Sequence, residues 1–224
     1  MKEKNLKKIL SIVGIVFVAV YLLFFLITTS ANLLTSYHLS GLTVLSNVWS
    51  ILKAIVLYGF VGFYFIYELV KKSDKHDKVI NIILFVVLCI LALSSLISMF
   101  KTISAFVAFI SYGNAIIIIR YLIDILNCMI RIGAFVLLGI NTMRLILNKN
   151  KNNKLSKILT IVIVGLLVLA FVNSSISTII NLIRIFNIKN LLLSMGYLIN
   201  GFSLSAFQSC LTYVVYKKLT TNKE

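Results

Sequence analysis

The 224-residue chain contains no proline. Proline breaks or kinks many membrane-spanning helices, and in transporters such breaks often lie at the binding site. Any interruption of a helix in this chain would have to be made at one of its 10 glycines. The absence of proline therefore weighs against a transporter built on broken helices.

Charged residues are also scarce, at 12% of the chain against about 25% in a typical soluble domain, whereas 60% of the residues are hydrophobic. A soluble core could not bury that much apolar surface, so lipid is the expected surroundings. Acidic residues number 6 against 22 basic ones, which gives a net charge of +16. The basic residues lie in short clusters between apolar runs, so they indicate membrane topology, and we expect no nucleic-acid partner.

Cysteine and histidine are too few and too scattered for a metal site or a disulfide framework. Cys89, Cys128 and Cys210 each lie inside an apolar run with no histidine nearby in the sequence, so packing is their expected role. The chain has no HExxH or Gly-x-Ser-x-Gly run. Because intramembrane catalysis needs a base or a metal beside its nucleophile, we expect no enzyme, no metal and no cofactor.

Six apolar runs are long enough to cross a bilayer, since about 20 residues at 1.5 Å each span a hydrocarbon core of about 30 Å. The sequence therefore predicts an all-α fold, a polytopic transmembrane helical bundle that forms a single integral membrane domain over residues 1–224. The predicted spans are residues 9–28, 50–70, 79–98, 122–146, 158–178 and 193–216.

Two further apolar segments fit this scheme less well. Residues 103–119 could form a short span, but only Arg120 separates them from the next run, which leaves no residues for a turn. We expect an interfacial or re-entrant segment there, with Gly113-Asn114 as the candidate bend. Residues 179–188 mix Asn and Arg with Ile and Phe, which is typical of a short helix lying in the membrane interface.

Lysine and arginine also predict orientation. Sixteen of the 22 fall in four clusters: the amino-terminal tail, the second-to-third and fourth-to-fifth connections, and the carboxy-terminal tail. Because basic residues gather on the cytoplasmic side, both termini are predicted to lie in the cytoplasm, in the cell membrane. The spans then form three hairpins; common descent of the hairpins stays open, because any six-span protein with this charge pattern would look alike. The richness in Lys, Asn and Ile is typical of an AT-rich bacterial genome.

The fourth predicted span carries the most informative polar residues. Steps of four and three residues place one set of side chains on a single helix face: Arg120, Asp124, Asn127, Arg131, Ala134, Leu138 and Asn141. One interpretation is a cationic pocket open to the outside, in which Asp124, Asn127 and Arg131, with Lys53 of the second span, bind a small anionic or zwitterionic ligand. The alternative is a structural Arg120–Asp124 pair at the water boundary.

Two other spans carry polar residues of interest. On the sixth, Gly201 and Ser205 form a small-xxx-small pair that predicts close helix packing, and Gln208 on the same face is either a packing residue or part of the Arg131 pocket. On the second, Glu68 lies one turn before Lys71, and an exposed ion pair is the expected outcome.

In size and number of spans, the chain is similar to the substrate-binding membrane subunits of energy-coupling-factor vitamin transporters, six-helix bundles that work with a separate energising complex. It lacks the alanine-x-x-x-alanine docking pattern of their first helix, since Ala19 is the only alanine of the first predicted span. It is also similar in outline to small multi-span proteins that protect bacteria against their own bacteriocins. The expected function is small-molecule transport or ligand binding; the alternative is a non-catalytic accessory, partner-binding or immunity protein with a membrane-protein partner.

Overall fold

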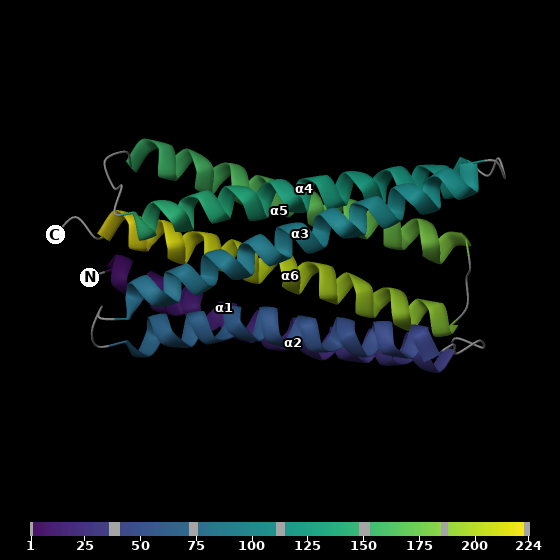
Figure 1. Ribbon diagram of the computed structural model, residues 1–224, viewed down its shortest axis with the longest axis horizontal. Coiled ribbons are helices and arrows are strands. Elements are labelled where there is room, and N and C mark those ends of the chain that lie inside the picture. The colour runs from purple at the N-terminus through teal and green to yellow at the C-terminus, as the bar shows by residue number, and fades with distance from the viewer. Residues whose placement is uncertain are drawn as a thin grey trace.

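The computed structural model describes residues 2–35, 41–71, 76–110, 115–147, 153–184 and 188–221. Each of these ranges contains one long helix, and the helices run alternately in opposite directions (Figure 1). In chain order they are α1 (Lys2–Thr35), α2 (Gly41–Val70), α3 (Asp77–Ile110), α4 (Ala115–Ile146), α5 (Asn153–Arg184) and α6 (Ile188–Thr221). Both termini lie at the same end of the bundle, which we call the termini end; the opposite end is the far end.

All six described helices are long and apolar enough to cross a membrane. They contain 30 to 34 residues, which corresponds to about 45–51 Å and exceeds a hydrocarbon core of about 30 Å. Large apolar side chains cover the outside of the bundle, and Leu45, Val56 and Ile183 are each at least 66% exposed. The chain is therefore a multi-pass membrane protein, and the predicted all-α bundle is confirmed.

The described residues of the two additional apolar segments form the ends of longer helices. Residues 103–110 complete α3 and residues 115–119 begin α4, whereas Gly113-Asn114 lies outside the described residues. Residues 179–184 complete α5, and Ile188 begins α6. The described parts of both segments therefore continue the neighbouring helices, in which the backbone hydrogen bonds are satisfied without a new turn. Their depth in a bilayer stays a prediction.

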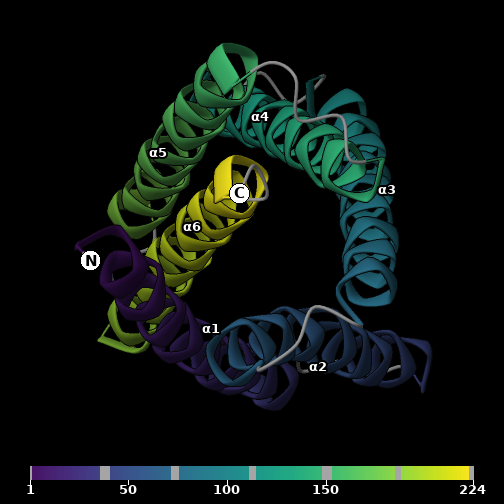
Figure 2. The ribbon, with the colours of Figure 1, turned by 90° about the vertical axis from the view of Figure 1, so that its left-hand side faces the viewer.

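The helices form three hairpins, and α6 lies inside the ring that the others make (Figure 2). Of the most apolar stretch of α6, 61% is buried, against 22–33% for the other helices. Among consecutive helices, α2 and α3 pack together least. They lie close at the termini end and diverge toward the far end, where α3 lies beside α4 (Figures 1 and 2).

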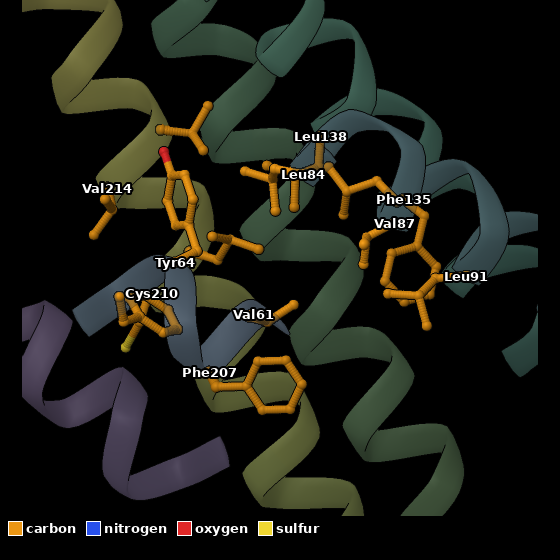
Figure 3. Packing of buried hydrophobic residues seen from close by; sticks show 14 of the residues in the cluster. Val61, Tyr64, Leu84, Val87, Leu91, Phe135, Leu138, Phe207, Cys210 and Val214 are labelled. Carbon is orange, nitrogen blue, oxygen red and sulfur yellow. The ribbon is translucent and has the colours of Figure 1, made fainter. Parts of the chain in front are cut away.

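All six helices contribute side chains to the apolar core, and Figure 3 shows the part in which side chains of α2, α3, α4 and α6 interdigitate. Tyr64 and Phe207 are at most 1% exposed. The predicted inward face of α4 is confirmed by Leu138 and Asn141, which are buried as well. Gly201 lets α6 approach α5 closely, as predicted, since a Cβ there would lie 3.3 Å from the Ser174 hydroxyl oxygen. Because lipid tails are as apolar as these side chains, such close packing rather than the hydrophobic effect holds the helices together.

Candidate ligand-binding cavities

Two cavities lie between the helices on the far side of the core. The Asp124 cavity, with a volume of about 520 Å³, is lined by α1, α4, α5 and α6. The Lys53 cavity, of about 480 Å³, is lined by α1, α2, α3 and α4. Tyr21, Phe25 and Arg131 line both, so the guanidinium of Arg131 lies between the two cavities. Both volumes are in the range of small-molecule sites.

Two of the charged residues in the Asp124 cavity, Arg120 and Asp124, have protein partners. Asp124 Oδ1 accepts a hydrogen bond from Ser177 Oγ at 2.7 Å, and its Oδ2 lies 3.7 Å from Nε of Arg120. Arg120 Nη1 in turn donates to Asn181 Oδ1 at 2.6 Å. The predicted Arg120–Asp124 pair is thus present within α4, and the hydrogen bonds with Ser177 and Asn181 tie it to α5. About a third of each side chain is exposed, so the pair itself contributes little stability.

The Lys53 cavity has a different charge pattern. Lys53 of α2 donates a hydrogen bond to Ser94 Oγ of α3, and Arg131 Nε donates to Asn127 Oδ1 at 3.4 Å. Among the residues that the structure describes, no Asp or Glu lines this cavity. Within the described ranges, neither Lys53 nor Arg131 forms an ion pair. Two positive charges therefore face one cavity with no carboxylate to balance them.

Hydroxyl groups and aromatic rings complete the Lys53 cavity. Ser50 and Ser98 lie at its exposed rim, and Ser94 and Ser95 are half-buried. The rings of Tyr21 and Tyr58 line it as well, with centroids 4.6 Å apart. Phe207 packs 5.7 Å from both tyrosine rings and joins this wall to the core.

The structure brings most of the predicted site residues together, although their binding role stays a prediction. Lys53, Asn127 and Arg131 share the Lys53 cavity, and Asp124 shares the other cavity with Arg131. Gln208 lines neither cavity: it is 3% exposed and lies one helical turn deeper than Leu204, the deepest α6 residue of the Asp124 cavity. The packing interpretation therefore fits Gln208.

No protein-family model, curated protein or solved structure matches this chain. Any function has to be inferred from the geometry and charges of the chain itself.

A buried charge cluster at the termini end was missed in the sequence. The expectation of an exposed Glu68 was wrong, because its side chain is 0% exposed. Its carboxylate lies 2.7 Å from Nζ of Lys7, 2.6 Å from Nζ of Lys218 and 3.6 Å from Nζ of Lys71. Lys7 belongs to α1 and Lys218 to α6, and Lys71 directly follows the last residue of α2. A signal was available, since a carboxylate inside an apolar run needs a partner.

Asp77 extends this cluster to α3. Its Oδ2 lies 2.8 Å from Nζ of Lys71 and 3.0 Å from Nζ of Lys218, and its Oδ1 accepts a hydrogen bond from the Tyr67 hydroxyl at 2.9 Å. Two carboxylates and three ammonium groups thus tie four helices together. Because each carboxylate is surrounded by ammonium groups of the protein, this cluster fits a structural role better than ligand binding.

The three cysteines lie in three different environments. Cys210 is in the core, as predicted, whereas Cys89 is exposed on the outside of α3. Cys128 is half-buried and lines the Lys53 cavity. In the part of the chain that the structure describes, no three His, Cys, Asp or Glu side chains are grouped to hold a metal ion.

Proposed function

We propose that this chain is a non-catalytic ligand-binding or transport protein of the cell membrane, and that it binds a small anionic or zwitterionic molecule in the Lys53 cavity. One observation supports this most: Lys53 and Arg131, from two helices, face the same carboxylate-free cavity. A charge at membrane depth costs about 2.5–3.5 kcal/mol on insertion scales, and such residues usually have a partner or a function. An anionic ligand would supply the missing partner.

The groups lining the cavity suit a carboxylate or a phosphate. Arg131 offers a planar fork of donors and Lys53 a single ammonium, which together can hold two or three anionic oxygens. The serine hydroxyls add neutral donors and acceptors, and the aromatic wall suits an apolar part of the ligand. A zwitterion could place its acidic group at Arg131 and its ammonium near Asp124 in the adjoining cavity.

We further propose that the termini end is cytoplasmic and that both cavities open toward the outside of a bacterial cell. Basic residues support this orientation, because the described residues of all four basic clusters lie at the termini end. Each cluster has a member near the end of a described helix there: Lys8, Lys78, Lys157 and Lys217. The cavities lie on the opposite side of the core.

Native mass spectrometry of the protein, extracted mildly from its own membrane, tests this proposal, because one spectrum reports small molecules, lipids and protein partners. The wild type is compared with Lys53→Gln, Arg131→Gln and a control, Lys101→Gln. Lys101 is an exposed cation of α3 that lines neither cavity. A stoichiometric anion lost in the two cavity variants and kept in the control supports binding. A co-purifying protein with no such ligand favours the accessory role instead.

A further inference from the structure

We infer that the Lys53 cavity takes the anionic headgroup of a membrane amphiphile, which enters sideways between α2 and α3. This inference rests on the proposed function and narrows its ligand class. Its basis is the position of Lys53 and Arg131 relative to the gap between these helices and to the outer, apolar surface of the bundle.

The cavity lies where α2 and α3 separate. At the termini end the two helices are joined through Asp77, which contacts Tyr67 and Lys71. Toward the far end they diverge (Figure 1), and the Lys53–Ser94 hydrogen bond crosses between them inside the cavity. We call the line along which α2 and α3 meet the seam. Charged groups and core side chains join its two sides at the termini end, whereas at the cavity the hydrogen bond described above uses a neutral acceptor, Ser94, which a competing anion can replace.

Exposed apolar side chains lie beside the rim of the cavity, on the outside of α2 and α3. Trp49 and Val56 lie four residues before and three residues after Lys53, so they share its side of α2, and each is 67% exposed. Ile97 has the same relation to Ser94 on α3 and is 57% exposed. Lys53 thus lies between the interior of the cavity and two exposed apolar strips. One strip is Trp49 with Val56 on α2, and the other is Ile97 on α3.

This arrangement suits a ligand that carries an anionic group and a hydrocarbon chain in one molecule. The headgroup would accept hydrogen bonds from Lys53 and Arg131, and the chain would lie outside along Trp49, Val56 and Ile97. Such a ligand never leaves the membrane, so entry needs only the seam between α2 and α3. A free solute would gain nothing from the apolar strips beside Lys53.

Trp49 makes the inference testable, because it is the only tryptophan of the chain and lies one turn from Lys53. The full chain is placed in phosphatidylcholine nanodiscs with a small fraction of phosphatidylglycerol brominated near the headgroup. Matched discs carry brominated phosphatidylcholine at the same fraction. We expect stronger quenching of Trp49 by the anionic lipid than by the matched zwitterionic one.

Four variants show whether the excess comes from the cavity. Lys53→Gln and Arg131→Gln should abolish the excess quenching by the anionic lipid. Lys53→Arg should keep it, which separates loss of charge from damage to the fold, and Lys101→Gln should leave it unchanged. Equal quenching by the two lipids in the wild type would overturn the inference.

Glycerol phosphate, the soluble counterpart of the headgroup, distinguishes this failure from failure of the proposed function. If glycerol phosphate is retained in native mass spectra in a Lys53-dependent way while the lipids quench equally, the ligand is a free anion and only the lateral inference is wrong. If neither glycerol phosphate nor the anionic lipid shows Lys53-dependent binding, the proposed anion site is wrong as well.

Discussion

Neutralising Glu68 should destabilise the bundle more than any other single change of a carboxylate to an amide in the described helices. In Glu68→Gln the side chain keeps its size, but the negative charge between Lys7 and Lys218 is lost. Lys218 is 3% exposed and cannot turn to water. The substitution therefore leaves a buried ammonium group with fewer compensating charges.

The size of the effect follows from the contacts that remain. Removing one partner of a buried ion pair costs about 3–5 kcal/mol. Lys218 keeps Asp77 Oδ2 at 3.0 Å and Asn81 Oδ1 at 3.3 Å, and Lys7 is 23% exposed and can reach water. We therefore expect a loss near the lower limit, about 3 kcal/mol of unfolding free energy.

The assay is equilibrium unfolding in mixed detergent micelles, with Asp124→Asn as the matched control. The control makes the same chemical change at a pair that is 3.7 Å apart and about a third exposed, so its cost should be about 0–1 kcal/mol. The double variant Glu68→Gln/Lys218→Met removes the stranded ammonium and should recover part of the loss. Equal stability of Glu68→Gln and Asp124→Asn would refute the buried network.

Two further substitutions test packing. Gly14→Ala places a Cβ 2.6 Å from Cζ of Phe65, a fully buried ring, and should lower the unfolding free energy by about 1–3 kcal/mol in the same assay. The control is Gly165→Ala, which should cost nothing because a Cβ there would meet no atom within 4 Å. Equal effects of the two variants would contradict the contact between α1 and α2. Gln208→Leu removes a buried amide whose Nε2 has no hydrogen-bond partner among the described residues. Stability should therefore change by less than about 1.5 kcal/mol, and ligand retention in native mass spectra should not change. A lost ligand with an intact fold would show that Gln208 contacts the ligand.

The helices and the inward face of α4 could be predicted because both depend on spacing within one segment. A run of about 20 apolar residues requires a helix in lipid, and steps of three and four residues place Asp124 and Arg131 on one side of it. Close helix packing at Gly201 could be predicted in the same way, since a small residue on a helix face indicates close packing.

The prediction of an exposed Glu68 failed because the burial of this residue depends on which helices become neighbours. Glu68 meets Lys7 and Lys218, which are 61 and 150 positions away in the chain, because α1, α2 and α6 converge at the termini end. The spacing of residues within α2 carries no information about this. The depth of Gln208 likewise depends on the place of α6 inside the ring, which the spacing of residues within α6 does not give.

The central claim is that the Lys53 cavity is hydrated and positively charged, and Cys128 reports on both properties without knowledge of the ligand. In a chain carrying Cys89→Ala and Cys210→Ala, the reaction rates of Cys128 with anionic and cationic membrane-impermeant thiosulfonates of similar size are compared, and their ratio is divided by that of a simple thiol in water. We expect Cys128 to be modified, with a corrected ratio that favours the anionic reagent. This ratio should decrease in Lys53→Gln but not in Lys101→Gln. Complete protection of Cys128 from both reagents, or a ratio that Lys53→Gln leaves unchanged, would contradict this claim.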